Sequence, residues 1–401
     1  MARTQYSSDD IKEQMTYYVL NAIKTGGDPT DEELKEIIAN VISDRAKDLK
    51  MTLEARKALA GVVFNSLRRL DVIEPLMEDP SVTEIMVNGP DKVFFERDGK
   101  LYRSKIRFRD SKHLVTVISA FFANRNRPLN EANPIADLRL PDGSRANAVL
   151  PPVAPDGPIV TIRKFTGISH DIASLIRSGF ISEECARFLS ECVKNKKSIF
   201  LSGGTGSGKT TFLNCLSSFI DPSERVVTIE DSAELNLQNI ENLVRMEARL
   251  PGPDGSGEVN IGMMIRAALR MRPDRIIVGE VRGAESADMI HALNTGHPGS
   301  MCTGHANSCN EMLDRLTVMV MSGSNLPYEA IVSQISMGLD IILHITRGRD
   351  GRRYIDEVCR IMKSSGQTFN TKTLFAADKG GGHLERIAAE DELKVCKTYS
   401  Y

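Results

Sequence analysis

The first part of the chain has the hydrophobic pattern of amphipathic helices. From about residue 9 to residue 69, leucine, isoleucine and alanine recur every three or four positions among charged residues, which places them on one face of a helix. We therefore predict a helical segment over residues 1–72. The one role that we infer for this segment is docking on a partner. The clearest repeat consists of Leu34, Ile37, Ile38, Val41 and Ile42.

Between residues 73 and 165 the pattern changes to short alternating runs, which are typical of β-strands with one buried face. A longer periodic segment over Lys112–Ala123 indicates at least one helix. We therefore predict a small α+β domain over residues 73–165, followed by a linker over residues 166–178. The strand and turn signals are Thr83–Val87, Asn88–Pro90, Lys92–Arg97, Pro141–Gly143 and Ile159–Ile162.

From residue 179 to residue 370, apolar runs rich in isoleucine and valine alternate with helical segments. This alternation predicts an α/β domain with a parallel, doubly wound sheet. Residues 371–401 are polar and weakly periodic, so we predict a peripheral C-terminal tail. The strand candidates are Ser198–Ser202, Val226–Ile229, Arg275–Val278 and Ile341–Ile345.

The composition does not favour nucleic acid as a partner. The 401 residues are enough for two or three compact units, and 41% hydrophobic residues, 26% charged residues and a net charge of -2 are the balance of an ordinary soluble protein. Aromatic residues make up 5%, with no tryptophan, so no stacking platform for bases is evident. We interpret the one basic cluster, Arg347, Arg349, Arg352 and Arg353, as a solvated loop at a strand edge.

The cysteines and the apolar runs indicate the cellular compartment in which we expect the protein. Seven cysteines, an odd number without a CxxC pair, favour a reducing compartment and argue against a bound zinc ion. The first residues are polar and acidic and indicate no signal peptide. The longest apolar runs, such as Ile276–Val278 and Ile341–Leu343, are far shorter than the ~20 residues of a transmembrane helix. We therefore expect a cytoplasmic protein whose membrane association is peripheral.

A glycine-rich motif, GxxxxGK[ST], follows the apolar run SIFLS and precedes the helical segment TTFLNCLSSFI. This is the context of a phosphate-binding P-loop, in which glycines let backbone N–H groups face a polyphosphate and the helix adds its positive end. We expect Lys209 to reach the β- and γ-phosphates of ATP and Thr210 to bind Mg²⁺. The predicted ATP-binding residues are Gly203, Gly204, Thr205, Gly206, Ser207, Gly208, Lys209, Thr210 and Thr211.

Two glutamates directly follow strand candidates, where doubly wound folds bind their ligands. Glu230 is the candidate for a general base or for orienting water, with a helix cap or a surface pair as the alternative. Glu280 ends the run that starts at Pro273 and can face the metal, so we predict that Thr210 and Glu280 hold Mg²⁺, directly or through water. Arg282 is the candidate for stabilising transition-state charge, and an internal pair with a glutamate is equally open.

A histidine at the end of a later apolar run is a further candidate. His297 and His305 lie eight residues apart without carboxylate or thiolate partners at suitable offsets, which is a poor spacing for zinc. His305 could instead donate a hydrogen bond to a phosphate or relay the state of the nucleotide, with a purely structural role as the alternative.

Four segments, taken in order, resemble the motifs of the type II/type IV secretion ATPase superfamily, and in particular of its branch of Flp/Tad pilus assembly ATPases, the CpaF-like proteins. The resemblance covers about residues 60–365 and includes the preceding domain, with Ile85–Pro90, Leu140–Arg145 and Thr161–Phe165. It implies a RecA-like P-loop NTPase domain behind a small PAS-like α+β domain, in an ATP-hydrolysing motor that forms a homo-hexamer. The four motifs are Gly203–Thr210, Thr228–Leu235, Leu269–Arg282 and Thr303–Asn307.

The resemblance also implies a nucleotide between the two domains of a subunit, with arginines reaching its phosphates. Arg145 and Arg163 of the first domain are the candidates by matching position. Arg245 and Arg249 resemble family arginines that complete the site within or across subunits. The expected catalytic residues are then Glu230, Glu280, Lys209, Arg282 and His305.

Two motifs of related families are missing. The chain lacks the tetracysteine zinc motif of type II secretion and type IV pilus extension ATPases, and also a retraction segment after the histidine motif, which favours the Tad or type IV secretion side. We expect an ATPase that powers assembly of a Flp/Tad pilus or a related secretion system, with an inner-membrane platform protein as partner and no stable nucleic acid. The alternatives are a type IV secretion ATPase for DNA or effector transfer, a nucleic-acid motor, and a non-enzymatic scaffold.

Overall fold

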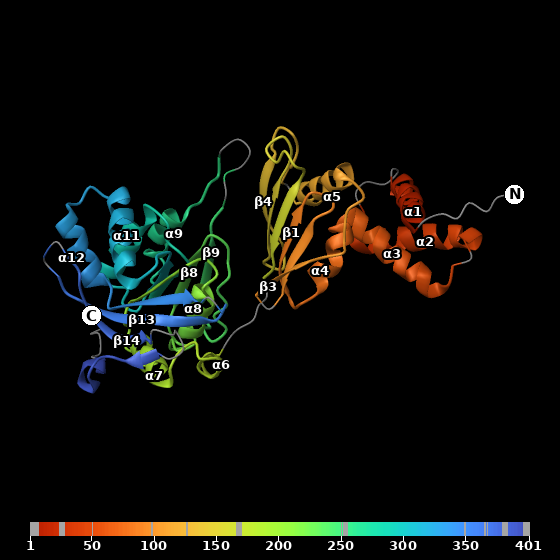
Figure 1. The fold of residues 1–401 in the computed structure, drawn as a ribbon. Helices are drawn as coiled ribbons and strands as arrows, with labels where there is room; N and C mark the ends of the chain where they lie inside the picture. Colours follow the sequence, from red (N-terminus) through yellow and green to blue (C-terminus); the bar gives the residue numbers. More distant parts are fainter. Residues whose placement is uncertain are drawn as a thin grey trace. The chain divides into compact units, whose positions relative to one another are not determined.

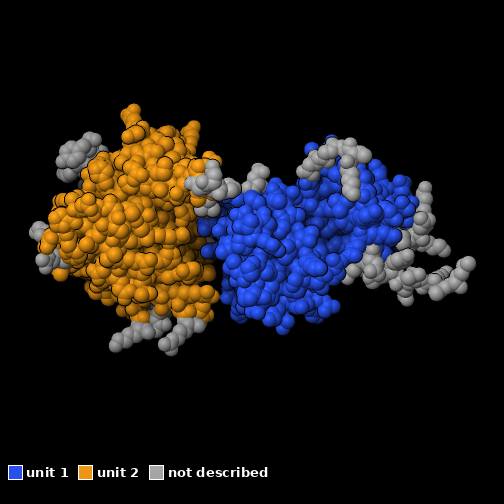
Figure 2. All heavy atoms as spheres, turned by 90° about the horizontal axis from the view of Figure 1, so that it is seen from above, with its two compact units in different colours: residues 1–166 blue, residues 167–401 orange. Residues whose placement is uncertain are grey.

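The chain folds into two compact units, residues 1–166 and residues 167–401, which Figure 2 draws in blue and orange. Each unit has its own hydrophobic core. The computed structural model describes residues 8–23, 29–49, 51–97, 99–125, 127–165, 171–249, 251, 256–348, 350–364, 366, 368–378 and 384–395.

Unit 1 opens with the predicted amphipathic helices (Figure 1). Thr52 marks the start of the third helix, because its side chain accepts the N–H of Ala55 and so caps the first turn. The helices are α1 (Ser8–Ile23), α2 (Asp31–Leu49) and α3 (Leu53–Arg68). Their apolar faces meet in a core of Met15, Val19, Leu34, Ile38, Ile42, Val63 and Phe64. The 3-10 helix η1 (Asp71–Ile73) and the short α4 (Glu74–Glu78) lead on to the sheet.

The rest of unit 1 is an antiparallel sheet with strand order β3-β2-β1-β6-β5-β4. Helix α5 (Ser111–Ala123) buries Leu114, Ile118 and Phe122 in the same core as one face of the sheet. Along β5 and β6 the buried residues alternate with residues on the other face, as expected for strands covered on one side. The strands are β1 (Val82–Asn88), β2 (Val93–Arg97), β3 (Lys100–Arg103), β4 (Ile135–Arg139), β5 (Arg145–Val149) and β6 (Ile159–Arg163).

Unit 2 is built on one large sheet with strand order β15-β14-β13-β12-β7-β11-β10-β8-β9 among its described residues. The strands from β12 to β9 in this order are parallel to one another, whereas the pairings of β12 with β13, β13 with β14 and β14 with β15 are antiparallel. The strands are β7 (Ile199–Gly203), β8 (Val226–Glu230), β9 (Leu243–Glu247), β10 (Arg275–Val278), β11 (Met301–Gly304), β12 (Ile341–Arg347), β13 (Arg353–Met362), β14 (Asn370–Ala377) and β15 (Leu384–Arg386).

Helices cover both faces of this sheet, and therefore the central strands are buried along their whole length (Figure 1). One face carries α6 (Ile172–Arg177), α7 (Glu183–Lys194) and α8 (Lys209–Ser217). The other face carries α9 (Ile261–Ala268), α10 (Glu285–Asn294), α11 (Cys309–Gly323) and α12 (Tyr328–Gly338). The 3-10 helix η2 (Glu390–Leu393) follows β15. The predicted α/β class, with an α+β domain in front, is confirmed.

The predicted C-terminal tail needs correction. Strand β14 pairs with β13, so residues 370–377 belong to the sheet and not to a tail over residues 371–401. The pairing skips Leu374, because Val358 lies opposite Phe375 and Cys359 opposite Thr373. This bulge puts the adjacent Leu374 and Phe375 into the same core. The alternation that identifies a strand is therefore broken, which explains why the sequence pattern looked weak.

No helix in the described part of the chain is long and apolar enough to cross a membrane. The basic cluster of the sequence falls on the turn between β12 and β13, with Arg347 and Arg353 directly opposite each other. Arg349 lies outside the described residues.

Candidate active site

The P-loop joins the central strand β7 to helix α8 in unit 2. Gly206 and Gly208 have φ angles of 69° and 99°, a region that favours glycine. At Gly203 a Cβ atom would lie 2.4 Å from the carbonyl oxygen of Ile345 on β12, so only glycine fits there. The loop therefore turns tightly between two packed strands and ends at the start of α8, where the first backbone N–H groups of a helix are open to an anion.

Lys209 lies at the centre of the site, with only 7% of its surface exposed. Its ammonium group donates to the carbonyl oxygens of Gly203 and Gly204, both at 2.9 Å, and lies 3.3 Å from Nδ1 of His305. Because a lysine ammonium can only donate, His305 Nδ1 accepts and its proton lies on Nε2. Burial, reinforced by Lys209, lowers the pKa of His305, which keeps this neutral tautomer.

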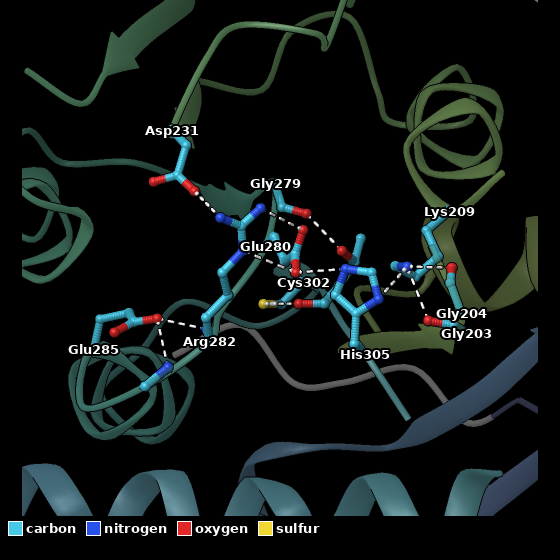
Figure 3. Close-up of polar contacts among 12 residues, drawn as sticks. Gly203, Gly204, Lys209, Asp231, Gly279, Glu280, Arg282, Glu285, Cys302 and His305 are labelled. Atoms are coloured by element: carbon cyan, nitrogen blue, oxygen red, sulfur yellow. Dashed lines mark hydrogen bonds and ion pairs between the residues drawn. The ribbon is translucent and has the colours of Figure 1, made fainter. Parts of the chain in front are cut away.

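A connected row of polar contacts runs on from His305 (Figure 3). His305 Nε2 lies 2.8 Å from Oε1 of Glu280, and Arg282 donates to both oxygens of Glu280 at 3.0 and 3.1 Å. Arg282 also reaches Oδ2 of Asp231 at 3.1 Å. The hydrogen bonds to Glu280 raise the pKa of Arg282. Arg282 therefore pairs with a glutamate of the same chain, which is the alternative that the sequence left open. His305, Glu280 and Arg282 together link Lys209 to Asp231.

Glu230 lies at the end of β8 in a different environment. It is 3% exposed, and its Oε1 accepts the backbone N–H groups of Glu234 at 2.8 Å and Leu235 at 2.9 Å. Burial raises the pKa of Glu230 to about 7. Gly279 packs against it, since a Cβ there would lie 2.9 Å from Cγ of Glu230. This carboxyl can therefore exchange a proton near neutral pH, as a general base requires.

The donor set fits a nucleoside triphosphate with Mg²⁺. Thr210 and Thr211 are half-buried in the first turn of α8, directly after Lys209 in the chain. A helix N-terminus and an ammonium group are suited to phosphate, and a hydroxyl with a carboxylate such as Glu280 is suited to a hard divalent cation. Ser207 adds a buried hydroxyl without a hydrogen-bond partner among the described residues.

The predicted arginines fall into two groups. Arg145 and Arg163 lie opposite each other on β5 and β6 of unit 1, and Arg139 lies opposite Arg145 on β4, so that three arginines form a row across the sheet. In unit 2, Arg245 lies exposed on β9 and donates to the carbonyl oxygen of Leu235 at 3.2 Å. Arg249 forms a bridge with Val259 just after β9.

Sequence reasoning missed Arg353 as part of the P-loop environment. Its Nε donates to the carbonyl oxygen of Gly206 at 2.8 Å, and its Cδ lies 3.6 Å from the Cβ position of Gly208. Strand β12 pairs with β7, and β13 returns beside β12, so the start of β13 comes to the P-loop. No local pattern reveals this contact, because it depends on the order of the strands.

A P-loop at the central strand of a mainly parallel sheet, preceded in the chain by an antiparallel α+β domain, defines a P-loop NTPase fold of the RecA-like type. A family model described as "Type II/IV secretion system protein" matches residues 67–385, and the chain belongs to that family.

Curated relatives agree with this assignment. A Mycobacterium tuberculosis protein named "Putative conjugal transfer protein" is 36% identical over 325 residues, which covers 80% of this chain and 92% of the relative. The type IV secretion system protein VirB11 of Brucella suis is 31% identical over 350 residues, which covers 79% of this chain and 95% of VirB11.

Solved structures share the fold. The pilus retraction motor PilT with bound ADP has a TM-score of 0.52 at 20% identity, covering 81% of this chain and 84% of PilT. The ATPase DotB of Legionella pneumophila has a TM-score of 0.50 at 22% identity, covering 71% of this chain and 78% of DotB.

Proposed function

We propose that this chain is an ATPase whose hydrolysis powers assembly of a Flp/Tad pilus or a related secretion system. Family membership supports the motor class. The observation that carries the proposal is the row of contacts from Lys209 through His305, Glu280 and Arg282 to Asp231, which connects the P-loop with the strand ends where hydrolysis needs its polar groups. The working form would be a homo-hexamer at the cytoplasmic face of the inner membrane, held there by a platform protein.

The residues divide the work of phosphoryl transfer. Lys209 and the N–H groups of the P-loop bind the phosphates, and Glu230 orients the attacking water and takes its proton. Mg²⁺ held by Thr210 and Glu280 would neutralise charge on the phosphates. His305 contacts both Lys209 and Glu280, so any shift of the Lys209 ammonium towards phosphate is felt at Glu280. His305 therefore relays the state of the nucleotide to the end of β10.

The arginine row of unit 1 is the proposed second half of the nucleotide site. Arg139, Arg145 and Arg163 place like charges next to one another on one face of the sheet, and a polyphosphate would relieve their mutual repulsion. We assign Arg145 and Arg163 to the phosphates, and Arg245 and Arg249 to completing the site within or across subunits.

The principal test is hydrolysis by two variants. Glu280→Gln should lower the ATPase rate by roughly 10²–10³-fold while nucleotide still binds, because it removes the negative charge that is proposed to hold Mg²⁺ and that binds Arg282. Lys209→Ala should abolish retention of Mg²⁺-nucleotide. Matched controls are Glu191→Gln and Lys194→Ala, an exposed pair on α7, which should behave as wild type. Wild-type turnover by Glu280→Gln, or unchanged nucleotide retention by Lys209→Ala, would defeat the proposal.

A second experiment separates the arginine row from the P-loop. Arg163→Ala should reduce turnover by up to roughly 10³–10⁵-fold, as for other arginines that reach a transferring phosphoryl group, with a far smaller effect on nucleotide affinity. Arg103→Ala, an exposed arginine on β3 of the same sheet, is the control. Equal turnover of the two variants would remove Arg163 from the site.

Type IV secretion of DNA or effectors is the second candidate, because both curated relatives carry names from conjugal transfer or type IV secretion. Genes for prepilin-like and polytopic membrane proteins beside this gene would favour the pilus. Stimulation of the ATPase by single-stranded DNA would favour a nucleic-acid motor instead.

A further inference from the structure

Two cysteines and a glutamate converge in unit 2 outside the proposed nucleotide site. Cys309 is the first residue of α11, and Glu357 and Cys359 lie on β13. The potential ligand atoms of these three residues all lie within 4.8 Å of one another. Both cysteines are buried, with 0% and 3% exposure. The cluster joins residues far apart in sequence, so no spacing motif could reveal it.

The fold brings these side chains together by strand alternation. Glu357 and Cys359 are two residues apart on β13 and so point to the same face of the sheet. Cys309 and Cys359 belong to the core on that face, where α11 also packs. The cluster therefore lies at the point where the start of α11 meets β13.

Hydrogen bonds already orient the three groups. The backbone N–H of Cys309 donates to Oε1 of Glu357 at 2.6 Å, which leaves Oε2 towards the sulfur of Cys359 at 3.8 Å. In a tetrahedral zinc site, with Zn–S about 2.3 Å and Zn–O about 2.1 Å, a sulfur and an oxygen ligand are about 3.6 Å apart. The observed separation needs a shift of only a few tenths of an ångström. Thr373 Oγ1 lies 3.6 Å from the Cys359 sulfur and supports it from β14.

The local electrostatics also suit a cation. Glu357 places a carboxylate beside two buried thiols, so a cation bound here would face a negative charge and two soft ligands. A coordinating metal deprotonates thiols outright, which removes the cost of a buried thiolate. Burial also shields both thiols from oxidants in solution, so the arrangement favours metal binding over a disulfide.

We propose that Cys309, Glu357 and Cys359 bind a thiophilic divalent cation of the zinc class. Two thiolates and a carboxylate prefer such an ion to Mg²⁺, and a water molecule can take the fourth position. The ion would tie the start of α11 to β13. Because α11 begins four residues after His305, the site would also fix the loop that carries this histidine. The proposal reverses the expectation, drawn from the absence of CxxC pairs, that the chain binds no zinc.

The test is metal binding by the full chain, measured without reference to hydrolysis. Protein purified without an affinity metal should contain about one zinc ion per chain by elemental analysis. Titration of metal-free protein with Co²⁺ should produce a thiolate-to-cobalt charge-transfer band. Both signals should disappear in Cys309→Ser and in Cys359→Ser. Cys215→Ser, a buried cysteine of the opposite core, should keep both.

Two milder variants test the site through their affinity for Co²⁺ even if a cysteine variant fails to fold. Glu357→Gln keeps an acceptor for the Cys309 N–H but loses the charge, and Thr373→Val removes the hydroxyl beside Cys359. Thr373→Val should weaken Co²⁺ binding by roughly 10–100-fold, the usual effect of disturbing the surroundings of a metal ligand, and Glu357→Gln, which removes the charge of a ligand, should weaken it at least as much. Unchanged affinity in both variants, wild-type protein without metal or a charge-transfer band, or a Cys309–Cys359 disulfide found in place of the metal would each overturn the proposal.

Discussion

The ends of β8 and β10 lie side by side in the sheet, yet their glutamates have opposite surroundings. Ile229 pairs with Val278, so Glu230 lies one residue beyond this pair, at the end of β8, and Glu280 lies two residues beyond it, just after β10. Glu230 is buried and held by backbone N–H groups, whereas Glu280 is bound by the Arg282 guanidinium and faces His305. The strand end places a carboxylate at the site, and its surroundings decide what that carboxylate can do.

This difference separates two chemical roles. A buried carboxyl whose pKa is near 7 can accept a proton at neutral pH, as proposed for Glu230. Glu280, whose two oxygens accept hydrogen bonds from Arg282, is proposed instead to hold Mg²⁺ together with Thr210, directly or through water. Pairs of carboxyl groups with divergent environments are a recurring way to divide acid–base work from charge stabilisation.

Among the tests of this comparison between the two glutamates, the largest expected effect is on the chemistry of Glu230. Glu230→Gln keeps an oxygen that can accept the N–H groups of Glu234 and Leu235, but cannot take up a proton. Turnover should fall by roughly 10²–10⁴-fold, the usual contribution of a positioned general base. Steady-state ATPase assays and equilibrium nucleotide binding measure the two effects, and binding should change little. Glu241→Gln, on the exposed segment before β9, is the control; equal rates for both variants would end the distinction between the two strand ends.

The second-largest expected effect is the contribution of Glu230 to the pH dependence of folding stability. Burial raises the pKa of Glu230 in the folded protein to about 7, from about 4.5 for a glutamate in the unfolded chain, so between these pH values the folded protein retains a proton that the unfolded chain loses. The resulting stability is fully present below about pH 4.5 and is lost as the pH rises through about 7. The loss amounts to about 3 kcal/mol, from about 1.4 kcal/mol for each pKa unit. Urea unfolding of wild type and Glu230→Gln at about pH 5 and about pH 8 measures the difference, and parallel pH dependences would show that burial of Glu230 has no such effect.

Much of this site could be anticipated because local pattern encodes it. Three apolar runs lead to the P-loop, to Glu230 and to Glu280, and each of them ends in a glycine or an acidic residue. The structure has a strand at each of these runs, namely β7, β8 and β10. The alternation of apolar runs with helical segments along the chain also predicts the helices that cover both faces of the sheet. The fold class is confirmed for this reason.

Apart from the pair of Arg282 with a glutamate, the contacts between the site residues could not be predicted from the sequence. In sequence the strands run β7, β8, β10, β11, but in space the order is β7, β11, β10, β8. This order places His305, after β11, between Lys209 and Glu280, and brings Arg282 to Asp231. Contacts that depend on strand order leave no mark on the local sequence, and the same holds for Arg353 at the P-loop.

The smallest expected effect concerns the bridge between the two strand ends. Asp231→Asn removes the ion pair with Arg282, but both side chains are largely exposed, at 41% and 59%, so stability should change by less than about 1 kcal/mol. Turnover should change only a few-fold, since Arg282 keeps its two hydrogen bonds to Glu280. Unfolding and ATPase assays of Asp231→Asn beside Glu230→Gln compare adjacent residues of one strand end. Equal damage by both would mean that the Asp231–Arg282 bridge, and not the burial of Glu230, controls hydrolysis.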